Sequence, residues 1–190
     1  MPTETKDRIL ETSAELFRRY GYTGTGMKQI VAEANAPFGS LYHFFPGGKA
    51  ELGEEVIRRS GQMYRELFEA IADQAPDLVS GVEDFFAGAA EVLRQTDYED
   101  ACPIATVALE VASTSEPLRK ATADVFESWI AAASERAVAA GVGEAAAREL
   151  AITLICELEG AFLLCRAMKS TKPMEIAGAN ATAAAREALG

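Results

Sequence analysis

Apolar residues recur at helical spacing along almost the whole chain, and the pattern is already clear in residues 4–20. Ile9, Leu16, Phe17 and Tyr20 fall on one side of a helix with about 3.6 residues per turn. The alternation of polar residues with Val, Ile and Thr that is typical of strands is absent. The pattern therefore predicts an all-α fold.

Glycine, proline and asparagine mark the ends of the expected helices. Gly21 suits the end of a first helix, over 4–20, because glycine readily adopts a positive φ. Thr25 is expected to be the N-cap of a second, short helix. The further helices are expected at 26–34, 38–44, 49–74, 79–96, 103–112, 116–140, 144–169 and 173–188, with the turn Asn35-Ala36-Pro37 between the second and the third.

Two short helices joined by a three-residue turn, from Thr25 to Phe44, form the pattern of a helix-turn-helix. At 100° per residue, Phe38, Gly39, Tyr42 and His43 fall within one arc of about 140° on the second of them. Ser40, Leu41, Phe44 and Phe45 fall on the opposite side and can pack against the first helix. An exposed face with two aromatic rings and a histidine suits contact with a DNA groove.

The candidate DNA-contacting residues combine this exposed arc with hydroxyl and basic groups near it. The spacing alone leaves open that Tyr42 and His43 only pack between helices. Thr25 and Tyr42 could bind phosphate through their hydroxyls, and Lys49 through its charge. The full set is Thr25, Lys28, Phe38, Gly39, Ser40, Tyr42, His43 and Lys49.

The expected helix 144–169 is apolar on nearly all sides, so we expect it to be buried on both. A partner subunit on one side and the protomer's own core on the other would satisfy this pattern. The small residues of the last helix suit close packing, and the two helices could form a four-helix dimer bundle. A single compact monomeric core is the alternative. The residues expected at the dimer interface are Leu154, Leu158, Phe162, Ala177, Ala181 and Ala184.

A small-molecule pocket is expected between the helices of the body, lined mainly by apolar side chains. Each aromatic residue in this region is equally suited to the ordinary core. The candidate ligand-binding residues are Phe85, Phe86, Ile104, Leu109, Phe126, Trp129, Glu159 and Phe162, with Arg166 as a further polar anchor.

The net charge of −11 over 190 residues changes this picture only slightly. Residues 1–60 carry eight basic and eight acidic side chains, so the whole negative excess lies in residues 61–190. Distant acidic charge is screened at physiological salt, where the Debye length is about 8 Å. The charge therefore does not exclude DNA as a partner.

The sequence offers little for catalysis. His43 is the only histidine, and Cys102, Cys156 and Cys165 are too widely spaced for a CxxC metal site or a disulfide framework. No nucleophile elbow or phosphate-binding loop is present. We expect no cofactor, no metal and no enzymatic activity.

Residues 6–52 resemble the DNA-binding head of TetR-family repressors. The resemblance rests on Leu16-Phe17, Gly21-Tyr22, Thr25, Glu33-Ala34, the run Gly39-Ser40-Leu41-Tyr42-His43-Phe44-Phe45, and Lys49 with Leu52. The runs Phe45-Pro46-Gly47-Gly48-Lys49, Cys102-Pro103-Ile104 and Ala108-Leu109-Glu110 are similar to a branch that includes LmrA- and YxaF-type repressors. Phe38 departs from the family, in which a polar or basic residue is common at this position.

The resemblance implies a helix-turn-helix DNA-binding domain at 1–48 and a helical ligand-binding and dimerisation domain at 49–190, joined by the long fourth helix. It further implies a homodimer that binds a palindromic operator and is released by a small-molecule inducer. Two alternatives remain: a small helical ligand-binding protein or enzyme whose head does not bind DNA, and an activator or ligand-independent regulator. We expect a cytoplasmic protein, because no uncharged apolar stretch is long enough for a membrane span and the N-terminus lacks the apolar segment of a signal peptide.

Overall fold

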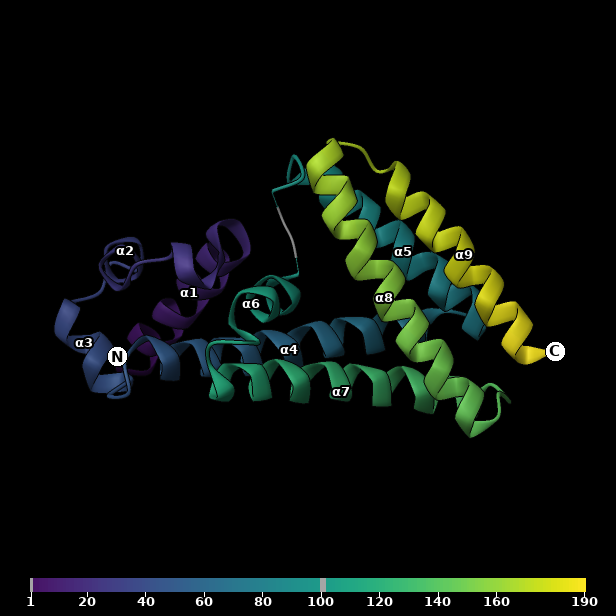
Figure 1. Ribbon diagram of the computed structural model, residues 1–190, viewed down its shortest axis with the longest axis horizontal. Coiled ribbons are helices and arrows are strands. Elements are labelled where there is room, and N and C mark those ends of the chain that lie inside the picture. The colour runs from purple at the N-terminus through teal and green to yellow at the C-terminus, as the bar shows by residue number, and fades with distance from the viewer. Residues whose placement is uncertain (1, 100–101) are drawn as a thin grey trace. The chain divides into compact units, whose positions relative to one another are not determined.

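The computed structural model describes residues 2–99 and 102–190, and within them all regular structure is helical (Figure 1). The helices are α1 (Pro2–Gly24), α2 (Met27–Glu33), α3 (Phe38–Phe44), α4 (Lys49–Gln74), α5 (Leu78–Gln95), α6 (Pro103–Val111), α7 (Glu116–Ala139), α8 (Glu144–Met168) and α9 (Lys172–Leu189). The all-α prediction is confirmed. Among the described residues no helix is both long and apolar enough to cross a membrane.

The chain forms two compact units, and α4 and α7 each contribute to both. The first unit contains residues 1–62 and 102–125, and the second contains residues 63–101 and 126–190. The first unit therefore combines α1, α2, α3 and α6 with the first parts of the two long helices. The expected domain boundary after residue 48 stays a prediction.

The residues of the first unit that are expected at helix ends and turns adopt the predicted conformations, with one exception. Gly21 has φ 74° and interrupts α1, and Asn35 has φ 48° in the turn before α3. The prediction that Thr25 caps α2 is wrong, because the N-cap is Gly26. Thr25 is buried instead, and its hydroxyl donates to the carbonyl oxygens of Gly21 at 2.7 Å and Leu16 at 3.3 Å.

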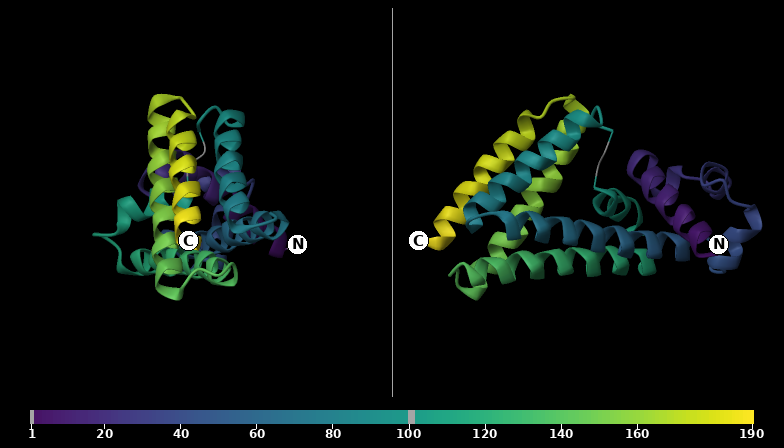
Figure 2. Two further views of the ribbon diagram at one scale, coloured as in Figure 1. Left: turned by 90° about the vertical axis from the view of Figure 1, so that its right-hand side faces the viewer. Right: turned by 180° about the vertical axis from the view of Figure 1, so that it is seen from behind.

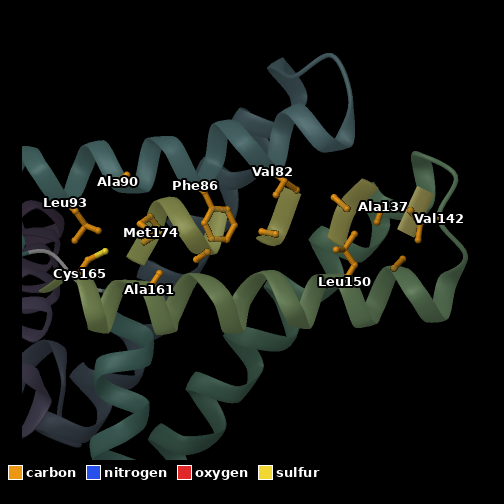
Figure 3. Close-up of a cluster of buried hydrophobic side chains, with 14 residues drawn as sticks. Val82, Phe86, Ala90, Leu93, Ala137, Val142, Leu150, Ala161, Cys165 and Met174 are labelled. Carbon is orange, nitrogen blue, oxygen red and sulfur yellow. The ribbon is translucent and has the colours of Figure 1, made fainter. Parts of the chain in front are cut away.

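The second unit is built around α5, α8 and α9, which lie side by side in all views (Figure 2). Phe86, Leu93 and Met174 are buried between these helices, together with a series of alanines (Figure 3). Small residues let the backbones approach closely: a Cβ on Gly178 of α9 would lie 2.9 Å from the Cβ of Phe86. The core of this unit thus depends on small side chains as much as on large ones.

The residues that the sequence predicts at a dimer interface lie on α8 and α9 and contact the core of the second unit. Ala177 and Ala181 are buried in the core of the second unit, and Leu154, Leu158, Phe162 and Ala184 pack against that core. These six residues thus contact the core of their own protomer, and their place at a dimer interface stays a prediction. Helical periodicity identifies two apolar sides of α8 but carries no information on which one faces α5 and α9.

The outer face of α8 is also apolar, and it is open in the protomer. The exposed fractions are 41% for Ile152, 51% for Leu164 and 64% for Leu163. Ile176 of α9 is 53% exposed beside them. The prediction that α8 is apolar on two sides is confirmed, and the described part of the chain covers its inner side and leaves its outer side open.

Candidate nucleic-acid interface

The first unit holds α3 by one side only. Leu41 and Phe45 are fully buried, in a core that also contains Ile9, Phe17 and Ile30. A fully buried side chain of this size stabilises the fold by roughly 1.5–3 kcal/mol relative to exposure. Burial of Leu41 and Phe45 therefore sets the rotation of α3 about its axis.

The other side of α3 is open, as the angular analysis predicts. Phe38 is 45% exposed and Tyr42 50% exposed, and Gly39 and His43 are exposed with them. The rings of Phe38 and Tyr42 meet edge to face, with centroids 5.6 Å apart, and the His43 ring lies 5.0 Å from that of Phe44 in the same manner. Such contacts contribute about 0.5–1.5 kcal/mol each and restrict the rotamers of the exposed rings.

The turn before α3 is fixed by its own hydrogen bonds. The amides of Asn35 and Ala36 donate to carbonyl oxygens in the last turn of α2, at 3.2 and 2.9 Å. Arg8 of α1 donates from Nε to the carbonyl oxygen of Ala34 at 3.2 Å. Because these bonds satisfy the end of α2, the angle between α2 and α3 is set by the backbone.

The predicted phosphate-binding groups differ in their availability. Lys28 of α2 is exposed, and Ser40 of α3 is half-buried. The Thr25 hydroxyl is buried and already donates within the unit, so it is not available to a phosphate.

Lys49, at the start of α4, lies against the protein and does not extend from it. Its ammonium is 4.4 Å from the centroid of the Tyr22 ring, an attractive cation–π geometry. Burial lowers the pKa of Lys49 from its ordinary value, and the nearby Glu110 carboxylate partly offsets this. A phosphate contact by Lys49 stays a prediction that requires the side chain to turn away from Tyr22.

Tyr22 and Glu110 are site neighbours that the analysis of single helices missed. Burial raises the pKa of the Tyr22 phenol, whose ring also contacts Phe17 edge to face at 5.4 Å. Glu110 of α6 accepts a hydrogen bond from the Thr23 amide at 2.6 Å. The only signal for either residue was its place in the runs Gly21-Tyr22 and Ala108-Leu109-Glu110, because a contact over 87 positions leaves no periodic pattern.

The candidate ligand-binding residues are divided between the two units. Ile104 and Leu109 belong to the first unit, where Ile104 is fully buried and Leu109 is 83% exposed. Phe86 is buried in the core of the second unit. Those that are half-buried, all in the second unit, are Phe85, Phe126, Trp129, Glu159 and Phe162.

Several half-buried aromatic residues of the second unit form two small groups. The Phe85 ring contacts those of Phe68 and Phe86 edge to face, and the Trp129 ring contacts those of Tyr64 and Phe126 in the same way. Arg166 donates from Nε to the Tyr98 carbonyl oxygen at 3.3 Å. The structure brings Phe126 and Trp129 together as neighbours on α7.

An open apolar groove of about 610 Å³ follows the outer face of α8 and α9. Ile152, Cys156, Gly160 and Leu164 line it from α8, and Ile176 from α9. A Cβ on Gly160 would meet no atom of this chain within 4 Å. The groove is therefore an open surface feature, lined mainly by apolar side chains together with Thr153 and Glu157 of α8.

Family models and relatives agree with this architecture. A model described as "Bacterial regulatory proteins, tetR family" matches residues 9–56, and one described as "Transcriptional regulator LmrA/YxaF-like, C-terminal domain" matches residues 79–180. The chain is 34% identical over 171 residues to the HTH-type transcriptional regulator YxaF of Bacillus subtilis (strain 168), an alignment that covers 90% of each chain. It is 30% identical to the HTH-type transcriptional regulator LmrA of the same organism, over 90% of this chain and 91% of that one.

Solved structures share the fold. The reduced form of E. coli NemR superposes with a TM-score of 0.81 at 22% identity, covering 93% of this chain and 94% of that chain. A TetR transcriptional regulator from Legionella pneumophila gives a TM-score of 0.82 at 21% identity, with the same coverage of 93% and 94%. With the two family models and the relatives of 30% identity or more, these observations confirm the resemblance: the chain belongs to the TetR family of helix-turn-helix transcriptional regulators and carries an LmrA/YxaF-like C-terminal domain.

Proposed function

We propose that the protein is a transcriptional repressor that binds a palindromic DNA operator as a homodimer and is released by a small, largely apolar ligand. It has no enzymatic activity in this proposal, and it acts in the cytoplasm, where its DNA lies. The observation that carries the proposal is the open face of α3, on which Phe38, Tyr42 and His43 are exposed while Leu41 anchors the helix.

The residues of this face divide into two roles. Phe38 and His43 read base edges, and the ring of Phe38 suits apolar contact with a thymine methyl group. Gly39 lets the backbone approach the groove. Tyr42 and Lys28 bind phosphate and position the helix, with Ser40 and Lys49 at the edges of the contact. Thr25 supports this arrangement from inside through its buried hydroxyl.

Dimerisation uses the outer face of α8 and α9. Ile152, Leu164 and Ile176 leave there an apolar surface that a soluble monomer rarely exposes. A second copy related by two-fold symmetry would place the same residues opposite one another. Two heads would then read the two halves of a palindrome.

The ligand binds beside the half-buried aromatic groups of the second unit. Phe85, Phe126 and Trp129 offer ring faces and edges that are not fully enclosed by the core. Glu159 and Phe162 of α8 complete the proposed site, with the carboxylate as the polar anchor. A ligand releases DNA only if it binds the two conformations with different affinity.

DNA binding is tested first, with a duplex selected by the protein from a random pool and with a duplex of scrambled sequence. We expect preferential binding of the selected duplex and a steep loss of affinity with salt, since phosphate contacts release counterions. Equal, weak binding of both duplexes at every salt concentration would contradict the proposal and favour the small ligand-binding protein or enzyme.

Release is tested by adding aromatic compounds to the complex with the selected duplex. The variant Trp129→Ala should shift the half-maximal ligand concentration and leave DNA affinity without ligand unchanged. A reporter gene placed behind the selected duplex distinguishes a repressor, whose loss raises expression, from an activator.

A further inference from the structure

Glu110 of α6 reaches into the head at the one point where the first helix is interrupted. Gly21 has φ 74°, and a Cβ at this position would overlap the Glu110 carboxylate. The carboxylate therefore occupies the space that any other residue at position 21 would need. The backbone itself requires glycine here, because other residues rarely combine φ 74° with ψ 171°, whereas the carboxylate is the end of a flexible side chain that can move.

The Glu110 carboxylate satisfies an amide that the interruption leaves without a helical partner. After Gly21 the chain starts a new helical turn, Tyr22–Gly24, whose first amides cannot donate to a preceding turn. The Thr23 amide donates to Oε2 of Glu110 at 2.6 Å. Hydrogen bonds to an ionised acceptor are shorter and stronger than those between neutral groups.

The Glu110 carboxylate also interacts electrostatically with Lys49, the first residue of α4. Glu110 raises the pKa of Lys49, against the larger lowering by burial, so it attracts the ammonium. The Lys49 ammonium lies 4.4 Å from the centroid of the Tyr22 ring. Tyr22 directly precedes Thr23 in the sequence. One side chain of α6 thus accepts a hydrogen bond from the end of α1 and attracts the first residue of α4 through space, all within the first unit.

We propose that Glu110 is a positioning residue for DNA binding: it fixes the corner at residues 21–24, and through it the orientation of α2 and α3. The corner leads directly into α2, since Thr25 and Gly26 are the only residues between Gly24 and Met27. The inference rests on the proposed DNA-binding function. It assigns no contact between Glu110 and DNA. Replacing Glu110 should therefore weaken DNA binding by changing the geometry of the head.

The contact itself is tested without DNA, by NMR of the full-length protein. The Thr23 amide of the wild type should be protected from hydrogen exchange, because it donates to the Glu110 carboxylate. In Glu110→Gln, which keeps one acceptor oxygen, this protection should be partly retained. In Glu110→Ala it should be lost. A Thr23 amide that is indifferent to Glu110→Gln and Glu110→Ala would overturn the proposal.

The functional part is tested with the duplex that the wild type selects from a random pool. Glu110→Ala should lower the affinity about tenfold or more, Glu110→Gln less, and binding of a scrambled duplex should change little. The matched control is Glu116→Ala, which changes the net charge equally but removes only exposed ionic interactions within α7, chiefly with Arg119 three residues away. Its affinity should stay within about twofold of the wild type.

The remaining outcomes distinguish a failure of the positioning role of Glu110 from a failure of the proposed function. Equal affinities for Glu110→Ala and Glu116→Ala, with a released Thr23 amide, would overturn the positioning role and leave the proposed function intact. If the wild type selects no duplex, the proposed function fails together with the DNA part of this inference, while the Thr23 amide still decides whether Glu110 holds the corner. If Glu110→Ala does not fold, the isosteric Glu110→Gln carries both measurements.

Discussion

Neighbouring residues on α3 have opposite surroundings, and this decides what each can do. Leu41 is fully buried, whereas Tyr42, the next residue, is 50% exposed. The buried residue contributes to the free energy of unfolding, and the exposed one can be changed with little effect on the fold. Substitutions on the open face of α3 are therefore suited to measure DNA contacts separately from stability.

We expect Phe38→Ala and His43→Ala to weaken binding of the selected duplex by about 1–3 kcal/mol each, because a base contact is lost. Binding of a scrambled duplex should be nearly unchanged. Tyr42→Phe should weaken both duplexes alike, since it removes only a phosphate hydrogen bond. Fluorescence anisotropy measures both affinities, and circular dichroism checks the fold. Wild-type affinity of both alanine variants would mean that α3 is not the reading helix.

The half-buried Tyr22 phenol makes the stability of the protein depend on pH in the alkaline range. Burial raises its pKa above the ordinary 10.0, so between pH 10.0 and the raised value the folded protein keeps a proton that the unfolded chain has lost. The contribution of Tyr22 is then fully present below pH 10.0 and is lost as the pH rises through the folded-state pKa.

We expect the urea midpoint of the wild type to fall more steeply above pH 10.0 than that of Tyr22→Phe, which has no phenol to titrate. Tyr42→Phe is the control, because it removes a different hydroxyl and leaves Tyr22 in place. Identical pH profiles for the wild type and Tyr22→Phe would contradict the predicted linkage.

At the scale of the helices, glycines have different roles that sequence does not distinguish. Gly178 of α9 and Gly88 of α5 both lie inside helices of the second unit. A Cβ on Gly178 would lie 2.9 Å from the Cβ of Phe86, whereas one on Gly88 would meet nothing within 4 Å. The first glycine permits close packing of two helices, and the second only lowers helix propensity.

We therefore expect opposite effects of the same substitution. Gly88→Ala should raise the free energy of unfolding by about 0.5–1 kcal/mol through helix propensity. Gly178→Ala should lower it by about 1–3 kcal/mol, because α9 and α5 must move apart. Urea denaturation followed by circular dichroism measures both. A stabilising Gly178→Ala would show that the contact with Phe86 relaxes without cost.

At the scale of the whole molecule, the two apolar faces of α8 separate folding from assembly. Phe162 packs against the core of the second unit, whereas Ile176 of α9 and Ile152 of α8 are exposed in the protomer. A charge on the inner face must be buried within the protomer, but a charge on the outer face is buried only when a second copy covers it.

We expect Ile176→Glu to give folded monomers and Phe162→Glu to give unfolded or aggregated protein. Light scattering measures the oligomeric state and circular dichroism the fold. Glu187→Gln, an exposed change near the end of α9, is the control and should leave the dimer intact. A folded dimer of Ile176→Glu would place the interface elsewhere.

Much of the architecture is determined locally, and the sequence alone therefore predicts it. The bounds of α3 and α4 match the expected 38–44 and 49–74, because glycine and proline end helices through their own backbone preferences. The open face of α3 was also predictable, since 100° per residue and the position of Leu41 determine which side is buried. Thr25 was misplaced because its hydroxyl bonds to two carbonyls in the tertiary structure and caps no helix.

Other features depend on contacts between residues far apart in the chain, and only the tertiary structure decides them. A helix such as α8, apolar on two sides, satisfies the same periodicity whichever side faces the core, so the inner position of Leu158 had no local signal. The contact of Glu110 with the Thr23 amide joins residues 87 positions apart. Local propensity determines where this chain is helical, whereas the packing of those helices determines which side chains are left for DNA, for a second subunit and for the link between α6 and the head.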